Sequence, residues 1–149
     1  MERIPDMEVV LASSNHGKIT EFKEILGNVG LNIIPQKEFS IEPADETVLT
    51  FVENAILKAR HASMQTKLPA IADDSGLQVD FLKGAPGIYS ARFAGEKATD
   101  DENNNYLLKR LKRVPKPLRT ARYQTVIVFL KHFYQKYLTL KFQIELYSE

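Results

Sequence analysis

The chain of 149 residues contains no cysteine, which excludes disulfides, thiolate metal sites and a cysteine nucleophile. Its longest apolar run, Val126 to Leu130, is far shorter than the roughly 20 residues that a membrane-spanning helix needs. The first six residues do not begin the long apolar segment that is typical of a signal peptide. The lack of cysteine also fits a reducing compartment.

Glycine and acidic residues are scarce in the C-terminal part of the chain. All seven glycines lie at or before Gly95, and residues 109–149 carry only 2 acidic residues beside 10 basic ones. Residues 1–108 carry 17 acidic and 10 basic residues, so the net charge of +1 hides an acidic body and a basic end. Such an asymmetry is typical of a nucleic-acid-binding tail, or it indicates two parts with different histories.

The length and composition are those of one globular domain, with 44% hydrophobic and 26% charged residues. Short apolar runs alternate with helical spacings of apolar residues. We expect strands near residues 8–12, 31–34, 70–72, 77–82 and 121–130, and helices near residues 19–29, 48–62 and 100–111. A capping box of Thr50 and Glu53 is expected at the second helix, with a loop over residues 36–47 before it. This alternation predicts the α/β class.

The first cluster that could carry chemistry lies between the first strand and the first helix. It consists of Ser13, Ser14, Asn15, His16, Gly17 and Lys18. Small and polar residues at a helix N-terminus let backbone N–H groups approach an anion, and a lysine there suits a phosphate. The alternative is a polar turn that caps the helix beside a surface lysine. The glycine pattern of a Walker A loop is missing.

The second cluster, Asp73-Asp74-Ser75-Gly76, follows a short apolar strand. Hard carboxylate oxygens on a short loop suit Mg²⁺, which keeps several waters and bridges to substrate phosphates. An aspartate there could also orient or deprotonate a water molecule. The alternative is a β-turn with a solvated acidic pair, in which Gly76 permits a tight turn.

Two further groups are weaker signals. Asp45 and Glu46 precede the long helix that carries Lys58, and Lys58 could point at the same site as the aspartates. The alternative is a solvated helix face whose acids stabilise the helix dipole. In residues 84–92, Tyr89 and Arg92 could stack on or bind a ligand.

Taken together and in this order, four stretches resemble the inosine/xanthosine triphosphate pyrophosphatase family, also called the HAM1-like family. The stretches are Ser14-Asn15-His16-Gly17-Lys18, Thr50-Phe51-Val52-Glu53-Asn54-Ala55-Ile56-Leu57-Lys58-Ala59, Ala72-Asp73-Asp74-Ser75-Gly76-Leu77 and Gly84-Ala85-Pro86-Gly87-Ile88-Tyr89-Ser90-Ala91-Arg92. The resemblance runs from about Val9 to His132. It implies an α/β fold with a central mixed sheet flanked by helices.

The resemblance also implies a Mg²⁺-dependent hydrolase. Such an enzyme splits ITP, dITP or XTP into the monophosphate and pyrophosphate, and it works as a cytoplasmic homodimer. Carried over to this chain, Ser13 to Lys18 would hold the triphosphate, and Ser75 would contact the nucleotide. Asp74 would be the general base and a metal ligand, with Asp45, Glu46 and Asp73 as further metal ligands. Lys58 would stabilise the charge on the phosphates.

After His132 the resemblance stops, and the glycine-rich motifs that help the family read the purine base are missing. We therefore expect an incomplete domain over residues 1–132, with an incomplete second lobe, and a divergent tail over residues 133–149. A frameshift or a misassigned gene end would explain this change. Weak discrimination between ITP and ATP is then expected. The alternatives are an inactive truncated remnant, or a nucleic-acid-binding protein that uses the basic, aromatic C-terminal part.

Overall fold

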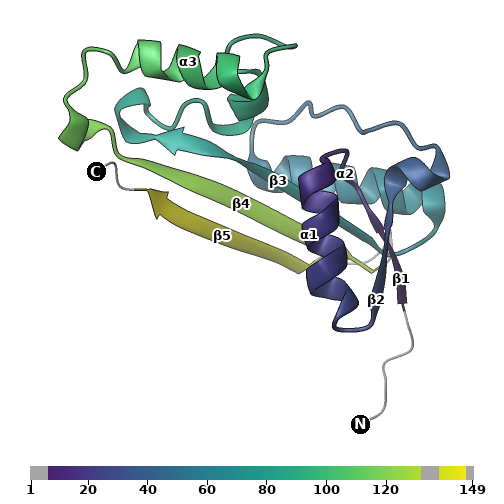
Figure 1. The fold of residues 1–149 in the computed structure, drawn as a ribbon. Coiled ribbons are helices and arrows are strands. Elements are labelled where there is room, and N and C mark those ends of the chain that lie inside the picture. The colour runs from purple at the N-terminus through teal and green to yellow at the C-terminus, as the bar shows by residue number, and fades with distance from the viewer. Residues whose placement is uncertain (1–6, 132–137, 147–149) are drawn as a thin grey trace. The chain divides into compact units, whose positions relative to one another are not determined.

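The computed structural model describes residues 7–131 and 138–146. Its strands are β1 (Met7–Leu11), β2 (Leu31–Pro35), β3 (Ala70–Val79), β4 (Ala121–Leu130) and β5 (Leu138–Leu146), and its α-helices are α1 (His16–Gly27), α2 (Phe51–Thr66) and α3 (Asp100–Arg110). The strands form one sheet in the order β2-β1-β3-β4-β5. β1 runs parallel to β2 and β3, whereas Figure 1 shows β4 running opposite to β3 and β5. The predicted α/β class with a mixed sheet is confirmed.

The chain divides into two compact units. The first comprises Met1–Asp73 and Ile127–Leu140, and the second comprises Asp74–Val126 and Lys141–Glu149. The chain changes from one unit to the other inside three strands. The changes lie between Asp73 and Asp74 in β3, between Val126 and Ile127 in β4, and between Leu140 and Lys141 in β5.

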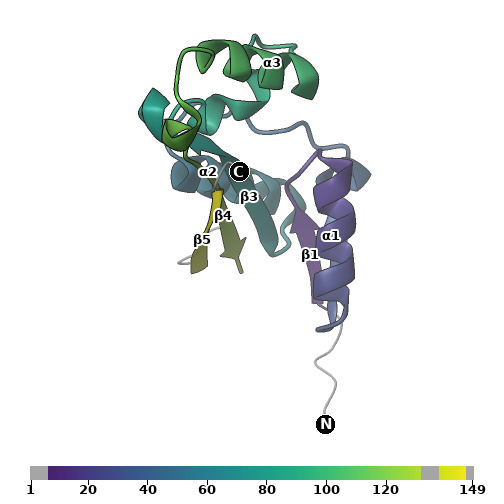
Figure 2. The same ribbon diagram turned by 60° about the vertical axis from the view of Figure 1, so that its left-hand side comes forward.

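The core of the first unit is built on β1, whose residues Val9, Val10 and Leu11 are all fully buried. A strand that is apolar on both faces needs cover on both faces. Val9 and Leu11 pack with Ile19 of α1, and α2 packs against β1 as well. Figure 2 shows α1 and α2 on opposite sides of β1. The small residues Ala55, Ala59 and Ala62 of α2 are fully buried, which permits close approach of this helix.

The caps of α1 and α2 follow from their sequences. The Asn15 side chain accepts a hydrogen bond from Lys18 N, and the Thr50 side chain accepts one from Glu53 N. Thr50 therefore caps α2 as expected, while the Glu53 carboxylate accepts from the Thr50 hydroxyl at 2.7 Å. Because Thr50 is the cap, α2 begins at Phe51 rather than at residue 48.

Strand β3 contradicts the prediction of two strands joined by a turn. Residues 70–79 form one continuous strand, so Asp73, Asp74, Ser75 and Gly76 are extended. A β-carbon on Gly76 would lie 2.1 Å from the Gly87 carbonyl oxygen. Gly76 is therefore required by close approach of another backbone segment and not by a turn. The strand ends at Val79, because residues 80–82 form a 3₁₀ turn.

The second unit packs α3 against the strand segments through a small apolar cluster. Val79, Leu111 and Val114 are its buried members, with Leu107 packed against them. Leu108, the neighbour of Leu107 on α3, is 57% exposed, so the helix buries only a narrow apolar face. The N-cap of α3 is Thr99, which forms a capping box with Glu102.

Residues 138–146 form β5 at the edge of the sheet, an element that the sequence analysis did not predict. The predicted domain boundary at residue 132 lies outside the described residues and stays a prediction. Among the described helices, none combines the length and the apolar character needed to cross a membrane.

Candidate functional site

The loop between β1 and α1 is shaped by its own polar side chains. Ser13 Oγ accepts a hydrogen bond from Asn15 N at 3.2 Å, and Asn15 Oδ1 accepts one from Lys18 N at 3.1 Å. Ser14, Asn15, His16 and Gly17 are exposed. The first backbone N–H groups of α1 thus lie at an accessible helix N-terminus, which suits the binding of an anion.

Lys18 reaches from this loop to β3. Its Nζ lies 2.5 Å from Asp73 Oδ2, although the two residues are 55 positions apart in the sequence. The Asp73 side chain is 3% exposed and the Lys18 side chain is 30% exposed. A carboxylate buried to this extent needs a charged or hydrogen-bonding partner. The parallel pairing of β1 with β3 explains why Lys18 reaches Asp73. Leu11 pairs with Ile71, so the residues that follow Leu11 and those that follow Ile71 leave this pairing at the same end of the two strands.

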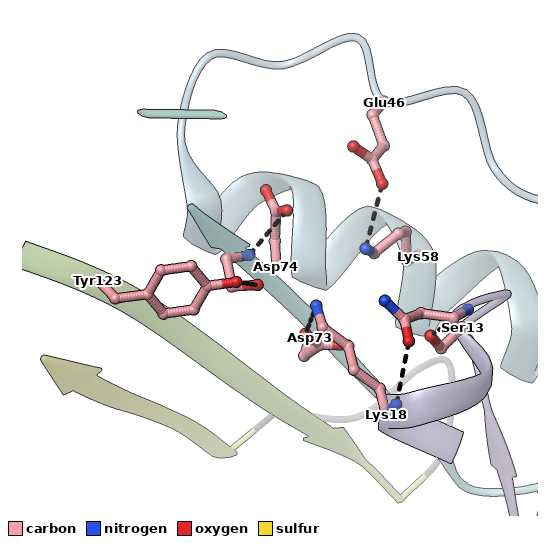
Figure 3. Close-up of polar contacts among 9 residues, drawn as sticks. Ser13, Lys18, Glu46, Lys58, Asp73, Asp74 and Tyr123 are labelled. Atoms are coloured by element: carbon pink, nitrogen blue, oxygen red, sulfur yellow. Dashed lines mark hydrogen bonds and ion pairs between the residues drawn. The ribbon is translucent and has the colours of Figure 1, made fainter. Parts of the chain in front are cut away.

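Lys58 forms another lysine–carboxylate pair of the first unit. Its Nζ lies 3.1 Å from Glu46 Oε1, and the two side chains are 17% and 30% exposed. Figure 3 draws this pair together with that of Lys18 and Asp73. The prediction that Lys58 points at the same site as Asp73 and Asp74 stays a prediction.

Asp45 lies apart from this pair, although it precedes Glu46 in the sequence. Asp45 is exposed and lines a pocket of about 680 Å³ together with Glu53, His61 and other residues of α2. The ring Nε2 of His61 lies 3.0 Å from the Glu42 carbonyl oxygen, which ties the same loop to the helix. The structure therefore separates the surroundings of Asp45 from those of Glu46.

The paired aspartates are buried, so the alternative of a solvated acidic turn is wrong. Asp73 is 2% exposed and Asp74 is 8% exposed. Successive side chains of a strand point to opposite faces, and Figure 3 shows the two carboxylates pointing apart. They are thus placed for two different tasks. Asp73 pairs with Lys18, while Asp74 Oδ1 accepts a hydrogen bond from Ser75 N at 3.0 Å.

Ser75 contacts a residue that the sequence analysis did not single out. Its Oγ lies 3.0 Å from the hydroxyl of Tyr123 on β4, and both residues belong to the second unit. No motif pointed to Tyr123, because a strand tyrosine is common in any sheet. The contact between Tyr123 and Ser75 follows from the position of β4 beside β3 in the sheet.

The polar side chains of residues 84–92 contact this segment and its neighbours in the second unit. The Arg92 guanidinium carbon lies 5.1 Å from the centre of the Tyr89 ring, and Arg92 Nε lies 3.8 Å from Glu96 Oε1. The two residues expected to contact a ligand therefore contact each other. Ser90, for which the sequence predicts no role, donates a hydrogen bond to the Gly87 carbonyl oxygen and accepts one from Leu77 N.

A metal site made by the protein alone is not found in the described part of the chain. Among residues 7–131 and 138–146, no group of three or more His, Asp or Glu residues is placed to hold a metal ion. The predicted ligands Asp45, Glu46, Asp73 and Asp74 are not gathered into one such group. Their hard oxygen atoms still fit Mg²⁺, which proteins hold by one or two carboxylates together with substrate phosphates and waters.

Comparison with known proteins identifies the family. Residues 9–145 match the Ham1 family. The chain belongs to the Ham1 family. The solved structure of a HAM1 protein from Coxiella burnetii is 44% identical, with a TM-score of 0.86 over 93% of this chain and 71% of that one. The Ham1 protein of Staphylococcus aureus is 39% identical, with a TM-score of 0.81 over 93% of this chain and 70% of that one.

Two curated Ham1 relatives are named dITP/XTP pyrophosphatase. That of Vibrio parahaemolyticus is 55% identical over 125 residues, which are 84% of this chain and 62% of the relative. That of Escherichia coli O157:H7 is 58% identical over 125 residues, which are 84% of this chain and 64% of the relative. The chain thus spans less than two thirds of the length of these relatives. The family resemblance expected from the sequence is confirmed, while the roles of the individual residues stay predictions.

Proposed function

We propose that this Ham1 chain binds a non-canonical purine nucleoside triphosphate, such as dITP, ITP or XTP, and hydrolyses it to the monophosphate and pyrophosphate. The observation that carries the proposal is the contact of Lys18 with Asp73, which joins the loop of residues 13–18 to the strand that carries Asp74. The names of the relatives supply the substrate class.

The phosphate groups are proposed to bind at the N-terminus of α1. Ser13 to Gly17 would supply backbone N–H groups and hydroxyls, and Lys18 and Lys58 would supply positive charge. A nucleoside triphosphate carries about four negative charges, and catalysis requires that the charge developing on the leaving pyrophosphate is stabilised. Both lysines are held by carboxylates, Lys18 by Asp73 and Lys58 by Glu46, which limits the rotamers of their long side chains.

Asp74 is proposed as the group that orients and deprotonates the attacking water. Its carboxylate has a defined orientation, because Oδ1 accepts the hydrogen bond from Ser75 N. An aspartate held within hydrogen-bond reach of water can act as general base. Ser75, which follows it on the strand, would contact the nucleotide.

Mg²⁺ is proposed as the cofactor. The carboxylate of Asp74 would hold it, and Asp45, Glu46 and Asp73 remain candidates for further contacts. When bound, Mg²⁺ supplies charge neutralisation of the phosphates and a lower pKa of a bound water molecule. A cytoplasmic homodimer is proposed from the same family resemblance, without nucleic acid or membrane as a partner.

Release of pyrophosphate tests the proposal directly. The purified chain is incubated with dITP, XTP, ITP and ATP, with Mg²⁺ and with chelator, and pyrophosphate is measured. We expect release that depends on Mg²⁺ and that falls by about 10³-fold in Asp74→Asn, since a general base and metal ligand is lost.

Asp101→Asn serves as the matched control, because Asp101 is an exposed aspartate in the first turn of α3. It should retain the activity of the unaltered chain. Undiminished hydrolysis in Asp74→Asn contradicts the role of Asp74, and no pyrophosphate release from any of the four nucleotides contradicts the proposed function itself.

A further inference from the structure

The hydroxyl of Ser90 connects two segments of the second unit. Ser90 Oγ donates a hydrogen bond to the Gly87 carbonyl oxygen at 2.6 Å and accepts one from Leu77 N at 2.9 Å. Leu77 belongs to β3, whereas Gly87 and Ser90 belong to the 3₁₀ segment of residues 87–92. One hydroxyl therefore acts as donor to its own segment and as acceptor from the strand.

The two segments touch at backbone level beside this hydroxyl. A β-carbon on Gly76 would lie 2.1 Å from the Gly87 carbonyl oxygen and 2.8 Å from Ser90 Oγ. Contacts below 3.0 Å essentially never occur for a real β-carbon, so glycine is the residue that lets β3 come this close. We name the group of Gly76, Leu77, Gly87 and Ser90 the Ser90 clasp.

The Ser90 clasp lies next to the residues proposed to act on the substrate. Only Gly76 separates Leu77 from Ser75, and Ser75 N donates the hydrogen bond to the Asp74 carboxylate. Leu77 is half-buried, and backbone N–H groups shielded from water are normally paired, so loss of the Ser90 hydroxyl would force Leu77 N to take another acceptor. The strand would then move at the point where Asp74 and Ser75 are attached.

We propose that Ser90 is a positioning residue for the reaction and sets the placement of Asp74 and Ser75 through the Ser90 clasp. This inference rests on the proposed function. A displacement of about 1 Å in a positioning element can lower a rate by about 10²-fold, because the reacting groups lose their alignment. The effect should fall on kcat more than on KM, since Ser75 is a single proposed nucleotide contact, whereas the proposed phosphate-binding loop of residues 13–18 is not part of the clasp.

The test compares Ser90→Ala, Ser90→Thr and Val114→Ala in the full chain. Ser90→Thr keeps a hydroxyl. Val114→Ala removes part of the buried apolar cluster of the same unit without touching the clasp. We expect Ser90→Ala to lower kcat for pyrophosphate release by about 10- to 100-fold with KM changed by less than about threefold. Ser90→Thr should return kcat to within about threefold of the unaltered chain.

Denaturant unfolding and amide hydrogen exchange accompany the kinetics. Val114→Ala is expected to lose stability and to keep its kcat, whereas Ser90→Ala should show faster exchange at Leu77. The proposal is overturned if folded Ser90→Ala keeps its kcat, or if Val114→Ala lowers kcat as much at a comparable loss of stability.

Absence of pyrophosphate release from the unaltered chain would be a failure of the proposed function rather than of the Ser90 clasp. Amide hydrogen exchange at Leu77 then tests whether the Ser90 hydroxyl holds the strand in place. Faster exchange at Leu77 in Ser90→Ala but not in Val114→Ala supports it, and unchanged exchange refutes it.

Discussion

Replacement of Gly76 by alanine tests the close packing of β3 directly. The added β-carbon would lie 2.1 Å from the Gly87 carbonyl oxygen and 3.0 Å from the Gly87 carbonyl carbon. Because these neighbours are backbone atoms, they cannot rotate away as a side chain can. Relief requires that the strand and the segment of residues 87–92 separate by about 1 Å, and overpacking of this kind costs about 1–3 kcal/mol.

The cost of overpacking alone is expected at the upper end of this range, because the obstructing atoms belong to the backbone. Alanine also restricts the unfolded chain, which offsets about 0.4–1 kcal/mol. We expect a net loss of about 2 kcal/mol in the free energy of unfolding, or about 6 °C in Tm for a chain of this size. Urea unfolding should show a lower midpoint with an unchanged m-value, since the surface exposed on unfolding stays the same.

Gly27→Ala is the matched control for this experiment. Gly27 is the last residue of α1, and no atom lies within 4 Å of a β-carbon added there. This variant should be as stable as the unaltered chain or more stable by up to about 1 kcal/mol, because alanine favours a helix. Equal stability of Gly76→Ala and the unaltered chain would refute the reasoning.

Three further perturbations follow from the described contacts. Lys18→Met should raise KM for the nucleotide and lower the free energy of unfolding by about 2 kcal/mol, because buried Asp73 loses a charged partner. Lys23→Met is its control, since Lys23 forms an exposed pair with Glu38 at 3.7 Å, and it should change neither quantity measurably. Thr50→Ala should cost about 1 kcal/mol in urea unfolding through loss of the α2 cap, and a stability equal to that of the unaltered chain would contradict the assigned cap. Hydrogen bonds from the backbone and then the hydroxyl of Thr99 lower the pKa of Glu102 below 4.5, so its contribution to stability is present above pH 4.5 and is lost as the pH falls through the lowered pKa. The difference in Tm between the unaltered chain and Glu102→Gln should therefore shrink as the pH is reduced below 4.5, and a constant difference would contradict this assignment.

The sequence predicted the elements whose signal is local. The period of apolar residues indicated α1, α2 and α3, and Thr50 marked the start of α2 because an N-cap hydrogen bond joins residues only three apart. The regular alternation of apolar and polar residues from Leu138 to Leu146 is typical of a strand, and it could have revealed β5.

The features that the sequence did not reveal depend on long-range contacts. Asp, Ser and Gly favour turns, so residues 73–76 were interpreted as a possible turn, and tertiary packing overrides this preference in β3. The pairing of Lys18 with Asp73 spans 55 residues, and the contact of Ser75 with Tyr123 spans 48. The motifs name the residues of the candidate site. The residue that each of them contacts is known only from the three-dimensional structure.

The pairs of Lys18 with Asp73 and of Lys58 with Glu46 have a consequence for how the proposed nucleotide would approach the first unit. Each ammonium is neutralised locally, Lys18 by Asp73 and Lys58 by Glu46, so at distances beyond about 8–10 Å their fields largely cancel at moderate ionic strength. Long-range attraction from these lysines therefore contributes little to the encounter. These two lysines should therefore add little to any salt dependence of the association rate, and their contribution to binding the proposed triphosphate should arise after contact, when phosphate oxygens compete with the carboxylates for the same ammonium protons.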